Sequence, residues 1–536
     1  MNTSYQGYWT NSYVDEVLAT FPNEEMYTVA AGISPSGVIH FGNFRDVITA
    51  FAVQKELEAR GKKTRFVFSW DDYDRFRKVP KGIDASFEEH LGKPLSQVPD
   101  PQGEFTSYAE RFEKEFEASM ADLGIEMEYI RQTEMYQAGK YDDQIFFALK
   151  HRKEIAKILL SFMSEKGKAG KGIVDEEYIE HYYPISVYSR FTGKDFTEIL
   201  DYDGGTKITY RCKVTKKEET VDLAVDRIAK LAWKVDWPMR WGFEGVNFEP
   251  AGLDHASPGS SYDVSGQITR EVFKRPKPVY AAYQFVGIQG LGSKMSGSKG
   301  NSISPGQLHE FYEGALLKFL YLKKLPGQTF SLAFDSEIYR QYEELDRKMT
   351  ELKEGTLNAS EAWALTVSQE GEATNYDKPI PFRQAVAFGQ IAQWDVEKLQ
   401  AMFATMGEDF QYDEASIKTR LPKARVWLQR YNAEEEIIIR DSVHAEYVAD
   451  MSDDQKNNIR ALREYLSGEV ASIEDINAQV YAIPKDESLD LKENKPRQRA
   501  FFKDVYQLLI TRDTGPRLST FLWMLDREQV IKLLDI

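Results

Sequence analysis

Cysteine is nearly absent from this sequence, and its scarcity excludes two kinds of site. Cys212 is the only cysteine among 536 residues, so an internal disulfide framework is impossible, which suits a reducing cytoplasm. A zinc site built from several thiolates is excluded for the same reason. The seven histidines are scattered and include no pair at metal-ligand spacing. We therefore expect no structural zinc and no other protein-bound metal.

Long apolar runs are missing as well. No stretch approaches the roughly 18 apolar residues of a membrane-spanning helix. Residues 1–17 lack the basic region and apolar stretch of a secretory signal. We expect a cytoplasmic protein that does not bind membranes. Apolar residues still make up 42% of the chain, which is enough for about two to four domains.

Basic residues are outnumbered by acidic ones. The 85 Asp and Glu residues against 68 Lys and Arg residues give a net charge of −17, which repels a polyanion at long range. We expect no DNA partner. RNA is not excluded, because a local basic face can bind one RNA while the acidic remainder suppresses non-specific binding. Residues 57–66 and 493–503 form two such local basic clusters.

The first part of the chain has the pattern of a parallel α/β fold. Residues 26–32 predict a short buried strand, and a loop with two glycines and a proline follows. Apolar residues at helical spacing predict a helix from Gly42 to about Arg60, and residues 64–70 predict a second strand. Strand, helix and strand in this order form one βαβ unit, so we expect a parallel sheet.

In the remainder of the chain, the sequence pattern first becomes that of an insertion and later becomes helical. Residues from about 75 to 225 have the pattern of an insertion, with a proline-rich loop, helices and then small β-hairpins over residues 182–221. Alternation resumes after Asp222, and residues 279–288 predict another strand. After about residue 305 the spacing of apolar residues is helical almost throughout, as at Phe501, Val505, Leu508 and Leu509.

The segment PSGVIHFGN, residues 35–43, lies where a strand leads into a helix. Free backbone N–H groups at a helix N-terminus favour anions. His40 lies just ahead of that terminus, and Gly37 and Gly42 allow the backbone to come close to a nucleotide. An ordinary βα turn with a surface histidine is the plainer interpretation of this motif alone.

The segment SKMSGSKGN, residues 293–301, follows a predicted strand and carries two lysines. A cationic loop of this kind could close over a triphosphate and stabilise the charge of departing pyrophosphate. Taken alone, it could equally be a solvated basic turn. The two motifs together, in this order and in these settings, favour one adenylate-forming site.

The pair resembles the HIGH and KMSKS signatures of class I aminoacyl-tRNA synthetases. Further segments closely resemble class I lysyl-tRNA synthetase, from residues 8–17 near the N-terminus to residues 514–525 near the C-terminus: AGISPSGVIHFGNFRDV, SWDDYDRFRKVP, KVDWPMRW, AGLDHASPGSSYD and TGPRL. The third and fourth carry most of the family specificity. The fold implied is a Rossmann-type parallel-sheet catalytic domain with an insertion subdomain, followed by an α-helical anticodon-binding C-terminal region.

This resemblance implies a reaction in two steps. Lysine and ATP, the latter with Mg²⁺, give lysyl-adenylate and pyrophosphate, and the 2′-hydroxyl of the terminal adenosine of tRNA(Lys) then attacks the activated carbonyl. The implied catalytic residues are His40, Asn43, Lys294 and Lys299. The implied ATP-binding residues are Pro35, Ser36, Gly37, His40, Gly42, Asn43, Lys294, Met295, Ser296 and Ser298.

Three departures from the family pattern bear on these expectations. Asn43 stands in place of the last histidine of the first signature, and an amide can still donate to the nucleotide. Gly297 stands in place of the second lysine of KMSKS, so Lys294 or Lys299 must supply the charge, and both remain candidates. Some relatives have cysteine pairs that resemble a zinc ribbon in the insertion. Here the insertion keeps the hairpin outline with Cys212 alone, which predicts a ribbon-like subdomain without metal.

Lysine selection requires a site that holds an ammonium ion. A carboxylate can do this, and so can an aromatic face, by a cation–π attraction of about 0.5–2 kcal/mol. Asp71, Asp72 and Asp74 are the candidate carboxylates. Core packing of Trp233 and an N-cap role for Asp72 are the plainer alternatives. The lysine-binding residues that we predict from the family-like motifs are Gly32, Ser34, Asp72, Trp233, His255 and Tyr283.

The implied domain limits are 1–75 with 225–305 for the catalytic domain, 76–224 for the insertion, 306–375 for a helical stem-contact region, and 376–536 for an anticodon-binding domain. Aromatic residues of the last region could stack on bases, although most are as well explained as core: Trp427, Tyr431, Phe501, Phe502 and Trp523. Arg497 and Arg499 could contact phosphates or form a solvated charge run. We expect a monomer.

Three alternatives remain open from the sequence. One is another class I enzyme, for glutamate, cysteine or arginine. Another is a small nucleotidyltransferase with a similar first loop, although the length of this chain argues against it. The last is a non-catalytic, synthetase-like RNA-binding protein, against which the two intact loops argue.

Overall fold

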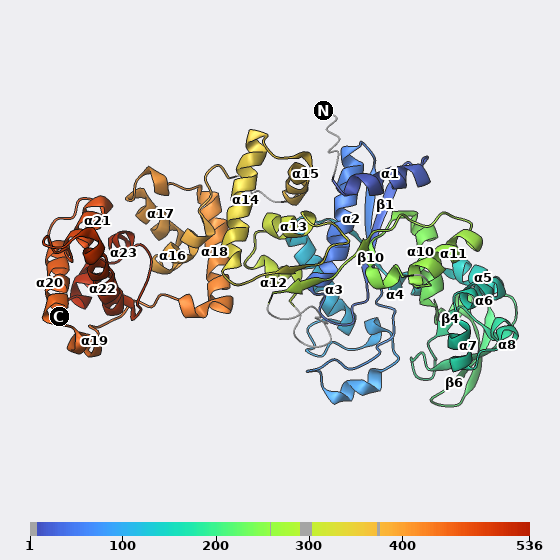
Figure 1. The fold of residues 1–536 in the computed structure, drawn as a ribbon. Helices are drawn as coiled ribbons and strands as arrows, with labels where there is room; N and C mark the ends of the chain where they lie inside the picture. Colours follow the sequence, from blue (N-terminus) through green and yellow to red (C-terminus); the bar gives the residue numbers. More distant parts are fainter. Residues whose placement is uncertain (1–7, 258, 290–302, 372–375) are drawn as a thin grey trace. The chain divides into compact units, whose positions relative to one another are not determined.

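The computed structural model describes residues 8–257, 259–289, 303–371 and 376–536 (Figure 1). The chain divides into two compact units. The first unit comprises residues 1–333 and 347–373, and the second comprises residues 334–346 and 374–536.

A four-stranded parallel sheet lies at the centre of the first unit. Its strand order is β3-β2-β1-β9, with β1 (Tyr27–Ile33), β2 (Thr64–Trp70), β3 (Glu128–Arg131) and β9 (Val246–Phe248). Helix α2 (Phe41–Ala59) joins β1 to β2 and lies beside them in Figure 1. The predicted βαβ unit and the α/β fold class are therefore confirmed.

Local sequence explains why α2 begins where it does and which side it buries. His40 is the N-cap residue, and its side chain and that of Asn43 form a reciprocal capping box. The apolar residues at helical spacing are all buried: Phe44, Val47, Ile48 and Phe51. The helix thus packs on the sheet while its N-terminus stays at the end of β1.

A close approach between β1 and β2 requires glycine at position 32. Gly32 pairs with Ser69 in the parallel register. A Cβ atom at Gly32 would lie 2.9 Å from the Ser69 carbonyl oxygen, closer than real side chains come. Glycine at this position therefore allows the carboxyl ends of the two strands to come close together.

The segment between β2 and α10 contains helices and a separate antiparallel sheet. Its helices are α3 (Tyr108–Asp122), α4 (Gln132–Gln137), α5 (Asp142–Lys150), α6 (Arg152–Ser161), α7 (Glu165–Lys171), α8 (Asp175–His181) and α9 (Leu223–Asp226). β3 lies within this segment and adds to the central sheet. The predicted hairpins are confirmed as a sheet of β5 (Thr197–Tyr202), β6 (Lys207–Cys212) and β7 (Glu218–Asp222). β4 (Ile185–Val187) and β8 (Ala229–Leu231) form a further antiparallel pair.

Cys212 ends β6 and is fully buried. The Thr192 Oγ1 atom lies 3.9 Å from its Sγ atom. Burial by itself would raise the pKa of the thiol, but hydrogen bonds from Ser189, Thr215 and the Val214 amide outweigh it and lower the pKa to about 6. Hydrogen-bonding groups thus surround the sulfur inside the hairpin sheet.

The rest of the first unit completes the surroundings of the sheet. Its elements are α1 (Thr10–Thr20), α10 (Trp233–Glu244), β10 (Ala251–Gly252), α11 (Ser261–Glu271), β11 (Ala282–Tyr283), β12 (Val286–Ile288), α12 (Pro305–His309), α13 (Gly314–Leu322), β13 (Phe330–Leu332) and α15 (Ala359–Ser368).

The prediction of one continuous strand over residues 279–288 is wrong. β11 pairs with β10, whereas β12 pairs with β13 in a different sheet. Between them the Gln284 amide donates to the Pro326 carbonyl oxygen at 2.9 Å. The chain changes strand partner at this point, so the apolar run is divided.

The second unit is built from helices in the residues that the structure describes. They are the first part of α14 (Glu337–Glu354), α16 (Phe382–Ile391), α17 (Val396–Ala404), α18 (Glu414–Tyr431), α19 (Ala445–Asp450), α20 (Asp453–Ser467), α21 (Ile473–Ala482), α22 (Leu491–Ile510), α23 (Leu518–Met524) and α24 (Arg527–Leu533). The helical pattern predicted at Phe501, Val505, Leu508 and Leu509 is confirmed, and these side chains are buried. Across the described residues, no helix combines the length and the apolarity needed to cross a membrane.

Buried contacts explain two of the candidate base-stacking residues as core. Trp427 is fully buried, and its Nε1 atom donates to the Phe334 carbonyl oxygen at 2.7 Å. Phe501 is 1% exposed. Arg420 is also 1% exposed and makes two hydrogen bonds to the Asp346 carboxylate. Trp427 and Phe501 therefore hold the helices of this unit together.

Candidate active site

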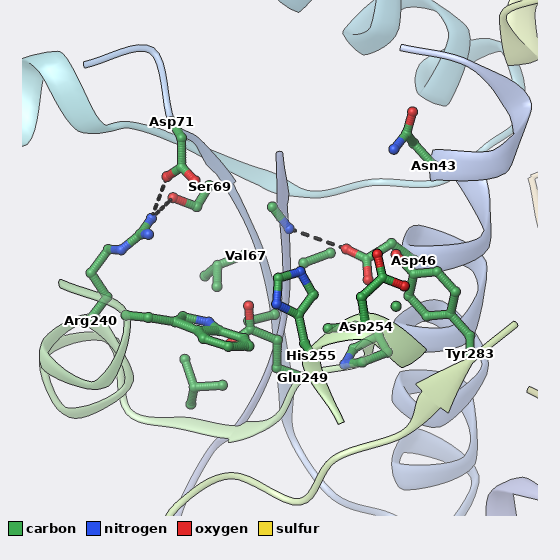
Figure 2. Close-up of a pocket in the computed structure, with 18 of the residues that line it drawn as sticks. Asn43, Asp46, Val67, Ser69, Asp71, Arg240, Glu249, Asp254, His255 and Tyr283 are labelled. Atoms are coloured by element: carbon green, nitrogen blue, oxygen red, sulfur yellow. Dashed lines mark hydrogen bonds and ion pairs between the residues drawn. The ribbon is translucent and has the colours of Figure 1, made fainter. Parts of the chain in front are cut away.

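Two adjacent cavities lie at the carboxyl end of β1, and His40 and Asn43 line both. The first, about 340 Å³, we call the acidic cavity (Figure 2). Its lining includes five carboxylates: Asp46, Asp71, Glu244, Glu249 and Asp254. The second, about 480 Å³, we call the basic cavity, because Arg75, Arg77 and Lys78 line it. Ligands of open α/β sheets bind at this end of the strands.

His40 is held as a neutral hydrogen-bond donor by the cap of α2. The Gly42 amide donates to His40 Nδ1 at 3.0 Å, and the His40 amide donates to Asn43 Oδ1 at 3.2 Å. Burial lowers the pKa of His40 below its ordinary value, so the ring is neutral at neutral pH. Since Nδ1 accepts, the neutral ring carries its proton on Nε2. The same cap leaves the Asn43 amide NH₂ group as a donor.

Glycine at position 42 leaves space for the imidazole ring of His40. A Cβ atom at this position would lie 2.8 Å from both Cε1 and Nδ1 of His40. Any larger residue would therefore push the ring out of the cap. Residues 40–43 therefore determine both the orientation of the His40 ring and the start of α2.

Asp46, which is buried, and Glu249, which is half-buried, form an acidic pair in the acidic cavity. The Gly32 amide lies 3.4 Å from Asp46 Oδ2, and Trp241 Nε1 donates to Glu249 Oε2 at 2.5 Å. Burial raises the pKa of both carboxyls, and the charge of Glu249 raises the pKa of Asp46 further. No ion pair joins either carboxylate to a cation within the described part of the chain. The pair therefore suits a cation that arrives as a ligand.

Arg240 occupies the opposite side of the same cavity. Its Nη1 atom donates to Asp71 Oδ1 at 2.8 Å and to Ser69 Oγ at 2.6 Å, as the dashed lines in Figure 2 show. Its guanidinium carbon also lies 5.3 Å from the centroid of the Trp233 ring. Burial raises the pKa of Asp71, and Arg240 offsets part of that effect. Asp71 is thus already neutralised within the protein.

Most of the predicted lysine-binding residues come together around the acidic cavity. Gly32, Trp233, His255 and Tyr283 line it, and in Figure 2 His255 and Glu249 lie between Arg240 on one side and Tyr283 on the other. Trp233 is 37% exposed and stacks on Trp237 with centroids 5.0 Å apart. Ser34 lines the basic cavity instead.

Asp72 lies apart from the other predicted lysine-binding residues. It is 3% exposed, is not among the lining residues of either cavity, and accepts a hydrogen bond from the Thr133 amide at 2.9 Å. Burial raises its pKa to about 6. Side chains at successive positions after a strand point to opposite sides, so Asp71 faces the cavity and Asp72 does not.

Asp46 and Glu249 were not predicted from the sequence, although two signals for them were present. Asp46 lies four residues after Gly42 on α2, which places the two on one face of the helix. Glu249 directly follows β9, at the carboxyl end of a parallel strand.

The basic cavity is formed by the loop before α2 and the segment after β2. Ser36 and Gly37 contribute from the loop, while Pro35 is buried beneath it. Arg75 Nη1 lies 3.2 Å from Asp195 Oδ2. Asp74, the carboxylate of this lining, forms an ion pair with Lys230. The charge facing the cavity is therefore positive.

The predicted residues of the second loop lie outside the described residues: Lys294, Met295, Ser296, Ser298 and Lys299. Among the residues that are described, no group of three or more His, Cys, Asp or Glu side chains is arranged to hold a metal ion.

A family model and individual relatives agree on the class of protein to which this chain is similar. The sequence model of a family described as "tRNA synthetases class I (K)" matches residues 7–369. A lysine–tRNA ligase of Streptomyces coelicolor is 36% identical over 571 residues and covers 98% of both chains. The lysine–tRNA ligases of Pyrococcus horikoshii and Pyrococcus furiosus are 33% and 35% identical, and each alignment covers 99% of both chains.

Proposed function

The chain belongs to the class I (K) family of tRNA synthetases, and from this premise we propose that it is a lysine–tRNA ligase. It activates L-lysine with ATP and transfers the lysyl group to the 3′-terminal adenosine of tRNA(Lys). The observation that carries the proposal is the acidic cavity, with the acidic pair of Asp46 and Glu249, directly beside His40 and Asn43.

The acidic pair of Asp46 and Glu249 holds the ε-ammonium group of lysine. Two neighbouring carboxylates with raised pKa values gain most from a cation, because it relieves both desolvation and their mutual repulsion. The walls formed by Trp233, His255 and Tyr283 enclose the aliphatic stem. The α-amino group lies near Gly32 and Ser34. A glutamate side chain would meet the acidic pair of Asp46 and Glu249, which argues against a glutamate-specific enzyme.

Activation takes place where the two cavities meet. A carboxylate oxygen of lysine attacks the α-phosphorus of ATP, and the bond from that phosphorus to the bridging oxygen of pyrophosphate breaks. His40 Nε2–H and the Asn43 amide donate to the phosphoryl oxygens as charge moves onto them. Lys294 or Lys299 supplies a further cation, and Mg²⁺ enters with the nucleotide as its counter-ion.

Transfer then proceeds from the same position. The 2′-hydroxyl oxygen of the terminal adenosine attacks the lysyl carbonyl carbon, AMP departs, and the hydroxyl proton leaves with it or passes to water. The protein contributes position and fixed donors rather than a covalent nucleophile. We further propose that the enzyme acts as a cytoplasmic monomer without a DNA partner, which size-exclusion chromatography with light scattering can test for the oligomeric state.

Amino-acid-dependent pyrophosphate exchange tests the substrate directly. The purified protein is supplied with ATP, Mg²⁺ and each amino acid in turn, and charging of a tRNA pool is followed in parallel. We expect lysine alone to stimulate both reactions. Stimulation by a different amino acid, with none by lysine, would refute the assignment.

Substitutions of the loop residues test the catalytic roles. His40→Ala should lower lysine-dependent exchange about 10²-fold, the usual cost of one charge-stabilising donor. Lys294→Ala and Lys299→Ala, compared side by side, identify the lysine that contacts the phosphates, since a loss of similar size is expected for one of them. Unchanged exchange in all three variants would contradict these catalytic roles.

A further inference from the structure

Lys230 is a buried cation that pairs with a carboxylate in the lining of the basic cavity. It is 6% exposed, and its Nζ atom donates to Asp74 Oδ1. Asp74 lines the basic cavity, whereas Lys230 is not among the lining residues of either cavity. The ion pair therefore lies in the wall of the site, with the carboxylate toward the cavity and the ammonium group behind it.

Both partners of this pair are ionised at neutral pH. Burial by itself would lower the pKa of Lys230, but the negative charges of Asp74 and two other aspartates outweigh it and raise the pKa. Burial by itself would raise the pKa of Asp74, but the charge and the hydrogen bond of Lys230 outweigh it and lower the pKa. One buried cation thus offsets the negative charge that Asp74 brings to the cavity wall.

The place of the pair says more about its role than its contribution to stability does. A buried ion pair adds little net stability, because removing two charges from water costs about as much as their attraction contributes. Without Lys230, however, the Asp74 carboxylate would stand unpaired in the lining of the basic cavity. It would repel phosphate groups and oppose the exposed guanidinium of Arg77, which lines the same cavity.

Lys230 reaches this position on β8, the strand that follows the hairpin sheet of β5, β6 and β7. β8 pairs with β4. Thr197 Oγ1, on β5, donates to the Val187 carbonyl oxygen of β4 at 2.8 Å. The Tyr188 hydroxyl, directly after β4, donates to the Tyr73 carbonyl oxygen at 2.5 Å. These contacts connect the hairpin sheet, through β4 and β8, to the segment that carries Asp74.

We propose that Lys230 is a positioning residue for ATP. It neutralises Asp74 and directs that carboxylate toward β8, so the basic cavity stays cationic toward the triphosphate. Because Lys230 comes from β8, packing of the hairpin sheet contributes to ATP affinity, although no described residue of that sheet lines either cavity. The proposal rests on the proposed function, which places ATP beside His40 and Asn43.

Lys230→Met keeps most of the side-chain stem and removes the charge. At pH 8, which favours an ionised Asp74, KM for ATP in lysine-dependent pyrophosphate exchange should rise about tenfold, the scale of one unpaired charge near a partly screened anion. KM for lysine should change less than about twofold, because Asp71 keeps its ion pair with Arg240. Lys230→Arg, which keeps the charge, should raise KM for ATP less than about threefold.

A second substitution separates the effect of charge from an effect on the fold. In Asp74→Asn/Lys230→Met the wall carries no unpaired charge, so KM for ATP should return to within about twofold of that of the unmodified protein. Lys318→Met is the matched control. Lys318 is fully buried on α13, donates to the Leu123 carbonyl oxygen at 2.7 Å and lines neither cavity. This variant should lower Tm and leave KM for ATP unchanged.

Calorimetric titration with ATP and Mg²⁺ makes the same comparison without catalysis. An unchanged ATP affinity in a folded Lys230→Met variant would overturn the proposal. Equal weakening in the single and the double variant would also overturn it, because Lys230 would then act through the fold and not through its charge. Absence of lysine-dependent exchange in the unmodified protein would instead overturn the proposed function, while the titrations would still decide the role of Lys230.

Discussion

The half-buried carboxylate of Glu249 provides the sharpest test of how lysine is selected. Glu249→Gln keeps the shape of the side chain, and the amide oxygen can still accept the hydrogen bond from Trp241 Nε1. Only the negative charge is removed. The effect on lysine binding can therefore be separated from an effect on the fold.

The expected size follows from the contact that is lost. A hydrogen bond to a charged group contributes about 1.5–3 kcal/mol. At about 1.36 kcal/mol for each factor of ten, kcat/KM for lysine should fall roughly 10- to 150-fold. KM for ATP should remain within about twofold, because a phosphoryl contact is not involved.

Norleucine, which has the stem of lysine without the ammonium group, gives a second measurement. In the unmodified protein it leaves the buried carboxylates without a cation and should be strongly rejected. In Glu249→Gln the ratio of lysine to norleucine exchange should fall by at least the same factor as kcat/KM for lysine, because the variant has one carboxylate fewer to reject norleucine. Glu244→Gln is the matched control, since that carboxylate lines the same cavity but is 2.9 Å from Arg65.

Glu249→Gln should preserve or raise the thermal stability of the protein while it lowers the activity toward lysine. Burial raises the pKa of Glu249, so its ionised form is disfavoured in the folded state. This cost is absent below the ordinary glutamic acid pKa of about 4.3 and fully present above the raised pKa. Without lysine, the Tm of Glu249→Gln at pH 8 should therefore equal or exceed that of the unmodified protein. An unchanged KM for lysine in a folded variant would refute the role of Glu249.

Three further predictions concern other parts of the chain. Gly42→Ala should lower lysine-dependent exchange about 10²-fold at unchanged circular dichroism, because the methyl group displaces His40 from the helix cap. Asp72→Asn should raise Tm at pH 8 but not below pH 4: the folded carboxyl, with its pKa raised to about 6, destabilises the fold only where it is ionised. Thermal scans at the two pH values check this, and an equal gain at both would contradict it. Arg420→Ala removes a buried guanidinium that donates to the partly exposed Asp346 carboxylate and to the Ile380 carbonyl oxygen, and it should destabilise the second unit by about 1.5–3 kcal/mol in urea unfolding, whereas a loss below about 1 kcal/mol would show that the pair is not needed.

The parts of the fold that could be predicted from sequence are those set by local spacing. The β1–α2–β2 unit follows from a buried strand, a glycine-rich loop and apolar residues at helical spacing, all within about 45 residues. The break between β11 and β12 could not be found in this way. Each of these strands is short, and its partner, β10 or β13, lies elsewhere in the chain. Tertiary pairing thus overrides a continuous apolar run.

The sequence also predicts only part of the active site when single side chains are considered. The motifs place Gly32, Trp233, His255 and Tyr283 around one cavity. They do not show whether Asp71 or Asp72 faces the cavity. The direction of each side chain depends on the backbone conformation just after the last residue of β2. Asp46 and Glu249 come from different elements and meet only when the sheet forms.

Cys212 gives the protein a built-in reporter of motion in the hairpin sheet. It is the only thiol in the sequence, and it is fully buried in β6. A thiol-specific reagent therefore meets a reactive sulfur only when this sheet opens. The labelling rate at increasing reagent concentration measures both how often the sheet opens and how costly the opening is. Addition of tRNA to the same assay would show whether binding closes this part of the protein.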